Sequence, residues 1–194
     1  MEKIRSFVAV PLSRELKDEL AELLSRLKSQ PRPWVKWVDP QSIHITLKFL
    51  GNIPLDKIEA VKAATAEAAK GVSPFNLKAC GLDVFPNPRR AQVIWVGLSG
   101  DAQKLAYLQQ KLESRLETIG FLSEGRKYSA HLTLGRVRRE ATVRQQEEIG
   151  RLAESTRCHL DTEIYVKSIC LMKSRLNPQG SIYSLLAEIP LDNS

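Results

Sequence analysis

Alternation of hydrophobic and polar residues divides the chain into strands and helices. The segment 43–49, IHITLKF, alternates strictly, as a strand with one buried face does. Ser13 suits a helix N-cap, and the leucines that recur every three or four positions from there to Leu27 indicate an amphipathic helix. The same two patterns predict further strands at 4–10, 75–85, 92–99, 129–137, 160–172 and 181–189, and further helices at 55–70, 101–119 and 142–155.

The predicted elements occur twice in the same order. Strand, helix, histidine-bearing strand, helix and strand occupy about 4–85, and the series returns at about 92–172, followed by the strand at 181–189. A unit of this length is too long for a solenoid repeat. No linker rich in Gly, Ser or Pro separates the two units. We therefore expect a single domain over 1–194, made of two pseudo-symmetric α+β lobes that face each other.

Charge and cysteine content narrow the class of protein. The chain has 29 Lys and Arg against 22 Asp and Glu, a formal net charge of +7, which favours a polyanionic partner such as nucleic acid. Three cysteines, none at CxxC spacing, argue against a disulfide framework or a zinc site and favour an intracellular protein. The N-terminus lacks the apolar run of a signal peptide, and no segment has the roughly 20 apolar residues of a membrane span. We expect a soluble, cytoplasmic protein.

Two of the three histidines occupy matched places in the repeat. His44 is followed by Thr46, and His131 by Thr133, so that strand alternation places each histidine and its threonine on one face. Two facing lobes would bring both pairs to one cleft. His159, in contrast, has no counterpart in the repeat, and we interpret it as structural or exposed.

Two imidazoles and two hydroxyls suit the cleavage of a phosphodiester. A neutral imidazole can take a proton from water, while an imidazolium gives a proton to the departing alkoxide. Threonine hydroxyls can donate to the non-bridging phosphate oxygens, where negative charge is held. This scheme requires no metal, and each motif offers only one good metal ligand, with no Cys, Asp or Glu at ligand spacing.

The two motifs resemble those of a known family. HITLKFLG at 44–51 and HLTLGR at 131–136 are similar to the paired motifs of the two-histidine phosphoesterase superfamily. The most similar branch is the RNA 2′,3′-cyclic 3′-phosphodiesterases, first described as 2′–5′ RNA ligases, and segments 34–51 and 171–191 also resemble that branch. The resemblance implies a bilobal fold with an open central cleft and no metal cofactor. We accordingly expect an α+β fold in which two antiparallel sheets face the cleft and the helices lie outside.

The resemblance also implies the site residues. They are His44, Thr46, His131 and Thr133, together with Arg136, the arginine that follows the second histidine by five residues. By analogy with the family, His44 is the proton donor and His131 the proton acceptor. The residue before the second histidine is usually proline in the family, and this chain has Ala130 instead.

Several other residues are candidates for the cleft. Strict alternation puts Arg136 on the face opposite His131, so Arg136 reaches a phosphate only if Gly135 ends or bulges the strand; a solvated charge is the alternative. Lys48 has the parity of the cleft face. Trp37 and Tyr183 are candidates for stacking on a base, with core packing as the alternative. Basic residues that flank the second motif and are candidates for an RNA path are Arg126, Lys127, Arg138 and Arg139.

The predicted activity is hydrolysis of an RNA terminal 2′,3′-cyclic phosphate to a 2′-phosphate, with 2′–5′ ligation of RNA ends as its reverse. The expected partner is RNA with such an end, tRNA fragments included, acted on by a monomer without cofactor or metal. Two alternatives stay open at this point. One is a nucleotide-binding module of the same fold without turnover, and the other is a phosphodiesterase for a small cyclic nucleotide.

Overall fold

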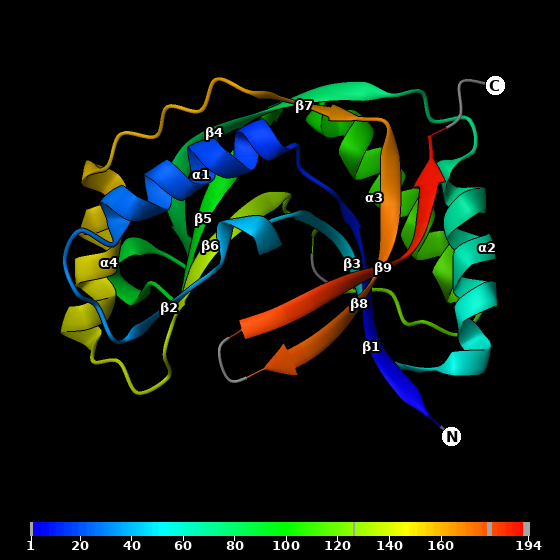
Figure 1. Cartoon of the computed structure of the whole chain (residues 1–194), viewed down its shortest axis with the longest axis horizontal. Coiled ribbons are helices and arrows are strands. Elements are labelled where there is room, and N and C mark those ends of the chain that lie inside the picture. The colour runs from blue at the N-terminus through cyan, green and yellow to red at the C-terminus, as the bar shows by residue number, and fades with distance from the viewer. Residues whose placement is uncertain (1, 126, 178–179, 192–194) are drawn as a thin grey trace.

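Strands dominate the computed structural model, which describes residues 2–125, 127–177 and 180–191. Nine strands in this part of the chain form one strongly curved sheet, in which every pairing is antiparallel (Figure 1). In chain order they are β1 Lys3–Val10, β2 Val35–Trp37, β3 Ile45–Pro54, β4 Phe75–Phe85, β5 Val93–Gly100, β6 His131–Val137, β7 Glu163–Val166, β8 Ser168–Asn177 and β9 Gly180–Pro190.

The order of the strands is symmetric about the middle of the sheet. Strands β7, β4, β5 and β6 form one half-sheet, and β3, β1, β8 and β9 form the other; β2 pairs with β6 outside this series. The two half-sheets are joined by the single residue pair Ile45 and Leu132. The predicted α+β fold with two lobes is thus confirmed, and the two expected sheets are halves of one continuous sheet. The predicted boundaries of the sequence repeat stay a prediction.

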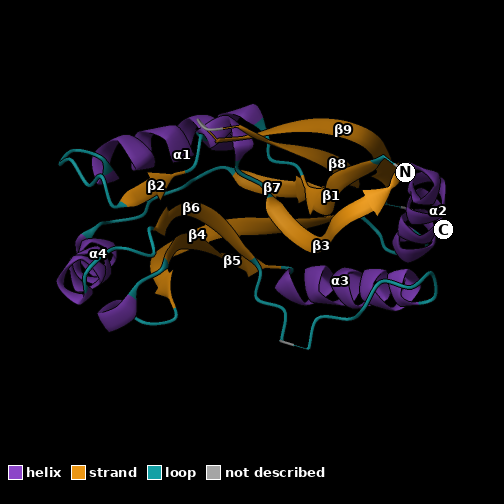
Figure 2. Cartoon of the chain, turned by 90° about the horizontal axis from the view of Figure 1, so that it is seen from below, coloured by secondary structure: helices purple, strands orange, loops and turns teal. Residues whose placement is uncertain are grey.

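Two helices cover each half-sheet (Figures 1 and 2). Helices α2 (Ile58–Ala69) and α3 (Ala102–Glu117) pack against each other and against β9 and β3, respectively. At the other end, α4 (Val143–Ser155) packs on β4. Helix α1 (Arg14–Leu27) covers the same half-sheet as α4. Its Glu19 carboxylate accepts hydrogen bonds from the backbone nitrogens of Asp161 and Thr162, which lie between α4 and β7. Helices α1 and α3 therefore each leave a strand of one half-sheet and cover the other.

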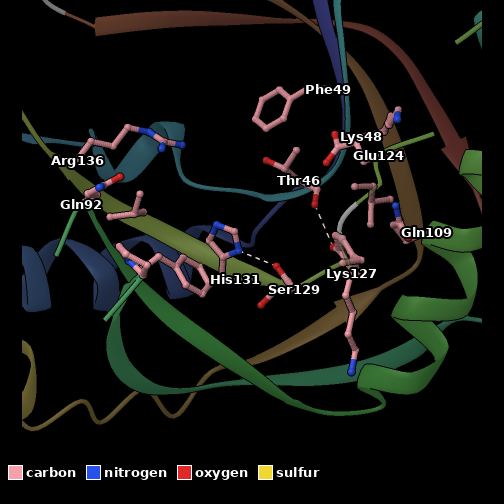
Figure 3. Close-up of a pocket in the computed structure, with 15 residues that line it drawn as sticks. Thr46, Lys48, Phe49, Gln92, Gln109, Glu124, Lys127, Ser129, His131 and Arg136 are labelled. Atoms are coloured by element: carbon pink, nitrogen blue, oxygen red, sulfur yellow. Dashed lines mark hydrogen bonds between the residues drawn. The ribbon is translucent and has the colours of Figure 1, made fainter. Parts of the chain in front are cut away.

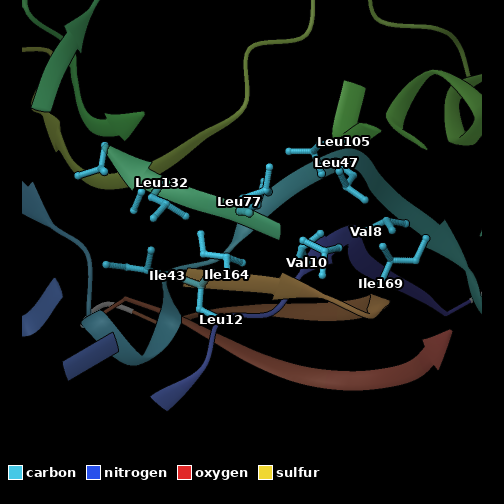
Figure 4. Packing of buried hydrophobic residues seen from close by; sticks show 14 of the residues in the cluster. Val8, Val10, Leu12, Ile43, Leu47, Leu77, Leu105, Leu132, Ile164 and Ile169 are labelled. Atoms are coloured by element: carbon cyan, nitrogen blue, oxygen red, sulfur yellow. The ribbon is translucent and has the colours of Figure 1, made fainter. Parts of the chain in front are cut away.

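The helices bury one face of the sheet in an apolar core. Ser13 caps α1, and the leucine stripe predicted from the sequence is fully buried, from Leu16 to Leu27. Figure 4 shows buried side chains of both half-sheets, including Leu47 and Leu132, in a common cluster. None of the helices in the described ranges is both long and apolar enough to cross a membrane.

The predicted strand at 160–172 is wrong as a single element. The structure has β7 paired with β4 in one half-sheet and β8 paired with β1 in the other, with Lys167 between them. Buried and exposed positions keep alternating from Glu163 through Lys167 to Ser168, so the pattern carries no sign of the break. The three-residue strand β2 was not predicted either, because three residues are too few to show a period.

Candidate active site

The two histidine motifs meet where the half-sheets join. Ile45 and Leu132 pair across this junction and are fully buried. Neighbouring residues of a strand point to opposite faces, so His44 and Thr46 project away from the core, as do their counterparts in the second motif. The strands are antiparallel, and each histidine therefore lies across from the threonine of the other motif. The predicted histidines and threonines are thus brought to one place.

Both imidazole rings are held by the same backbone contact. Nδ1 of His44 lies 2.8 Å from the carbonyl oxygen of Ser42, and Nδ1 of His131 lies 2.7 Å from that of Ser129, a bond drawn in Figure 3. A carbonyl oxygen can only accept, so Nδ1 carries the proton and donates in both rings. Nε2 of each ring is then left to exchange a proton with a substrate.

Aromatic side chains surround each ring. His44 stacks on Phe7, with ring centroids 4.7 Å apart, and meets the edge of Tyr183 at 5.2 Å. His131 has Phe85 at 5.2 Å and Trp95 at 6.0 Å, both edge-on.

Burial lowers the pKa of His44 below its ordinary value, because a charged ring is poorly solvated there. The hydrogen bond to the carbonyl of Ser42 opposes this shift, and the nearby charge of Lys17 adds to it. His44 is therefore neutral at neutral pH in the free protein.

A β-bulge follows each threonine at the same place. In the pairing of β1 with β3 the register skips Leu47, and in the pairing of β5 with β6 it skips Leu134. A bulge inserts one residue and shifts the parity of the strand beyond it. The residues five positions after each histidine, Phe49 and Arg136, consequently line the cavity beside His131 (Figure 3). Arg136 thus reaches this face through a bulge at Leu134, one residue before Gly135, where strict alternation required a bulge or a strand end.

The same bulge turns the Lys48 side chain inward, so that the parity predicted from alternation is wrong beyond Leu47, although Lys48 still lines the hollow beside His131. The Lys48 side chain is only 3% exposed, while that of Phe49, predicted to face the core, is 53% exposed. Lys48 Nζ donates to Oε2 of Glu113 on α3 and to the carbonyl oxygen of Leu122, both at 2.8 Å. Lys48 is therefore part of the support beneath the site.

Another hydrogen bond fixes the segment that leads to His131. The hydroxyl of Tyr128 donates to the carbonyl oxygen of Thr46 at 3.0 Å. Together with the contact of Lys48 to Leu122, this bond ties Leu122 and Tyr128 to β3. Residues of the first motif thus fix the position of Tyr128, which leads into the second motif. Strand alternation in the sequence does not predict this contact.

The largest hollow of the site has a volume of about 570 Å³. Thr46, Phe49, His131 and Arg136 line it, as Figure 3 shows. A second hollow of about 380 Å³ shares Arg136 with the first, and a third of about 160 Å³ contains His44. Thr133 is half-buried beside His131 and lines none of these three.

The remaining candidates are spread around this centre. Lys127 lines the first hollow, and Trp37 and Tyr183 line the second. Arg138 donates to the carbonyl oxygen of Pro33, Arg139 is exposed, and Arg126 lies outside the described residues. His159 is exposed and lines none of the hollows described above. In the described ranges no three His, Cys, Asp or Glu side chains come together as metal ligands would.

Two histidine–threonine motifs that meet at the centre of a duplicated sheet define a two-histidine phosphoesterase. The model of the family described as LigT like Phosphoesterase matches residues 10–95 and again residues 96–183. The chain belongs to this family.

Relatives over the full length have a common name. The RNA 2′,3′-cyclic phosphodiesterase of Methanothermobacter thermautotrophicus is 32% identical over 182 residues, which cover 94% of this chain and 96% of the relative. The protein of the same name from Aquifex aeolicus is 31% identical over 193 residues, with 98% and 99% covered.

Solved structures show the same fold. Escherichia coli LigT complexed with 3′-AMP superposes with a TM-score of 0.77 at 22% identity, and the match covers 98% of this chain and 99% of that one. The protein TT0787 of Thermus thermophilus gives a TM-score of 0.75 at 23% identity, with 97% and 98% covered.

Proposed function

We propose that this protein hydrolyses the terminal 2′,3′-cyclic phosphate of RNA to a 2′-phosphate, with His44 and His131 as an acid–base pair. The observation that carries the proposal is the matched setting of the two rings: each donates from Nδ1 to a backbone carbonyl, which leaves Nε2 available. The full-length relatives named RNA 2′,3′-cyclic phosphodiesterase support the choice of substrate.

In the proposed reaction a water molecule attacks phosphorus in line with O3′. Nε2 of His131 takes a proton from this water, the bond from phosphorus to O3′ breaks, and Nε2 of His44 gives a proton to O3′. The phosphate stays on O2′, and both histidines have exchanged one proton. The hydroxyls of Thr46 and Thr133 and the guanidinium of Arg136 hold the charge on the non-bridging oxygens. The same sequence of steps, with the 5′-hydroxyl of a second RNA end in place of water, forms a 2′–5′ phosphodiester and is 2′–5′ ligation.

The lowered pKa of His44 bears on its role as the acid. The free protein holds this ring neutral, so it has to gain a proton before it can donate one. A cyclic phosphate carries a negative charge, and an anion beside an imidazole favours the charged ring. In this proposal, substrate binding and protonation of His44 therefore occur together.

The hollow beside His131 has room and chemistry for the terminal nucleoside. Phe49 presents an exposed ring at its wall, on which a base can stack. Gln92 is exposed in the same space and carries an amide that can bond a base edge.

We further propose that the protein acts on RNA fragments, tRNA fragments included, as a cytoplasmic monomer without a metal. The net charge of +7 supports a polyanionic substrate. Three free cysteines support a reducing compartment.

Product analysis tests the proposal. An RNA oligomer with a 2′,3′-cyclic phosphate end should give only the 2′-phosphate with the wild-type protein, and should give it at least about a hundredfold more slowly with His44→Ala or His131→Ala. His159→Ala is the matched control, because it removes the exposed third histidine, and it should act as wild type does. Binding of the oligomer without any product would instead indicate a nucleotide-binding module, and turnover of small cyclic nucleotides alone would move the substrate class away from RNA.

A further inference from the structure

A second hollow adjoins the proposed catalytic one and has walls of a different kind. It has a volume of about 380 Å³ and lies between β2, the short helix Pro40–Ser42 and the hairpin of β8 and β9. In Figure 1 this hairpin reaches across the middle of the molecule toward β2. Arg136 lines both hollows, so that they meet at this residue. We call the second hollow the upstream pocket.

Two cations face each other across the wall of the upstream pocket. Lys36 of β2 and Arg136 of β6 are direct partners in an antiparallel pairing, and both side chains are exposed. Like charges at directly opposite positions repel each other and destabilise the pair. Neither side chain has an ion pair in the described part of the chain. An anion between them would remove this repulsion.

Asp39 is the one carboxylate among the described lining residues, so that Lys36 and Arg136 outnumber it and the lining keeps a positive charge. An oxygen of Asp39 accepts from the backbone nitrogen of Gln41 at 2.9 Å and caps the short helix. The other walls are aromatic or neutral: Trp37, Tyr183 and Ser181 line the pocket. The pocket therefore combines an anion site with aromatic surfaces, which is the chemistry that recognises a nucleotide unit of a single strand.

The substrate has only one direction in which to continue. In an RNA with a 2′,3′-cyclic phosphate end, both hydroxyls of the last ribose are bonded to the reacting phosphorus. The rest of the strand leaves through O5′, and the next phosphate lies one nucleoside away. We propose that the upstream pocket binds the nucleotide before the RNA end, with Lys36 on the phosphodiester that joins it to the terminal nucleoside. This inference rests on the proposed function and adds a recognition site to it.

Three substrates isolate the contact. They are a nucleoside 2′,3′-cyclic phosphate, a dinucleotide that ends in the same nucleotide, and that dinucleotide with a neutral methylphosphonate linkage. A hydrogen bond to a charged group typically contributes about tenfold or more. For the wild-type protein, kcat/KM should be about tenfold higher on the dinucleotide than on the mononucleotide, and the methylphosphonate should lose this advantage.

Lys36→Gln should lower kcat/KM on the dinucleotide by the same factor of about ten. It should leave the mononucleotide and the methylphosphonate unchanged, because neither presents an upstream charge. Lys28→Gln is the matched control: it removes one exposed positive charge that lines none of the hollows described here, and all three substrates should react as with wild type. The salt dependence of kcat/KM on the dinucleotide should also become shallower in Lys36→Gln, by about 0.7 in log–log slope.

Three outcomes would overturn the inference. Equal rates of the wild-type protein on mononucleotide and dinucleotide would show that nothing beyond the terminal nucleotide is recognised. An equal loss in Lys36→Gln on all three substrates would assign Lys36 to the reacting phosphate. Equal loss in Lys28→Gln would reduce the effect to net charge. Absence of turnover on every substrate is different, since it contradicts the proposed function itself.

Discussion

The first and second histidine motifs have the same backbone and different chemistry. In each, a carbonyl two residues before the histidine holds Nδ1, and a bulge follows the threonine. The residue delivered to the cleft by the bulge is Phe49 in the first motif and Arg136 in the second. The backbone geometry is common to both halves. The side chain that the bulge turns toward the cleft makes the wall apolar in the first motif, at Phe49, and charged in the second, at Arg136.

The residue before Phe49 and the residue before Arg136 differ in size, because different space is available behind each motif. In the first motif it is Lys48, buried beneath the sheet and bonded to Glu113. In the second it is Gly135, where an added Cβ would come within 3.0 Å of the Trp37 ring. Strand β2 lies against the second motif and leaves no room for a side chain there. The difference between the halves therefore follows from what packs behind each motif.

Removing either imidazole should have the largest effect. A proton-transfer group contributes about 10²–10⁴-fold, so His44→Ala and His131→Ala should each lose at least about a hundredfold in kcat, or roughly 2.7 kcal/mol of barrier. Steady-state rates on an RNA with a cyclic phosphate end measure this. Activity should persist in EDTA; its loss, with recovery on adding a divalent metal, would contradict the mechanism.

A 3′-thio substrate breaks the equivalence of the two histidines. A thiolate leaves without being protonated, so this substrate should restore much of the rate of His44→Ala and none of that of His131→Ala. Rescue of His131→Ala alone would reverse the assignment of acid and base. Rescue of neither would indicate that the rings chiefly stabilise phosphate charge.

Loss of Lys48 should destabilise the protein next most strongly. Lys48→Met leaves Glu113 buried without its partner, which we expect to lower the free energy of unfolding by about 3 kcal/mol. Urea denaturation measures it. The exposed pair of Lys78 and Glu163 is the control, and Lys78→Met should change stability by no more than about 1 kcal/mol. The double variant Lys48→Met/Glu113→Leu should regain part of the loss; strictly additive effects would show that the pair does not act as a unit.

Substitutions of Arg136 and Phe49, the residues that the bulges turn toward the cleft, should separate recognition of the phosphate charge from recognition of the base. Arg136→Gln should weaken inhibition by inorganic phosphate and by a nucleoside 2′-phosphate alike, by about tenfold. Phe49→Ala should weaken only the nucleotide, by about 1–3 kcal/mol, because stacking acts on the base. Inhibition constants for both ligands decide this. An equal effect of Phe49→Ala on inorganic phosphate would place its ring against the phosphate instead.

The smallest expected effect concerns the titration of His44. Its pKa in the folded protein is lowered by burial, whereas the unfolded chain has the ordinary value of about 6.5. Below pH 6.5 the unfolded chain binds more protons than the folded protein does. Lowering the pH should therefore decrease the free energy of unfolding, by at most about 1.4 kcal/mol per pH unit, until the folded-state pKa of His44 is reached. His44→Gln should remove this dependence and His159→Gln should leave it. A ring signal of His44 that titrates above pH 6.5 in NMR spectra would contradict the shift.

Local sequence patterns were sufficient for most of the fold. The leucine stripe of α1 and the two alternating histidine strands correspond to observed elements. Each is long enough for the helical or strand period of hydrophobic residues to be recognised in the sequence. The two motifs were also expected to come together, and they meet at the pairing of Ile45 with Leu132. Strict alternation failed at Lys48 and Phe49, because the bulge at Leu47 depends on the neighbouring strand and leaves no mark on the residues themselves.

Features that depend on partners far along the chain were not predictable. The crossing at Lys167 separates strands of different half-sheets without a glycine or proline. Strand β2 is defined by its pairing with the edge of β6. The same pairing places Lys36 directly opposite Arg136. Such pairings are set by tertiary contacts, which a local pattern does not contain.

The exchange of strands and helices between the half-sheets makes the two parts of the chain interdependent. A cut between β4 and β5 yields one piece with β1 to β4 and another with β5 to β9. The first piece lacks β5, against which β4 pairs, and the second lacks β1, against which β8 pairs. Each piece carries one of the two histidine motifs and exposes open strand edges, so neither forms a closed unit or an active site by itself. The protein is therefore suited to fragment complementation, in which two inactive halves regain activity only by interlocking.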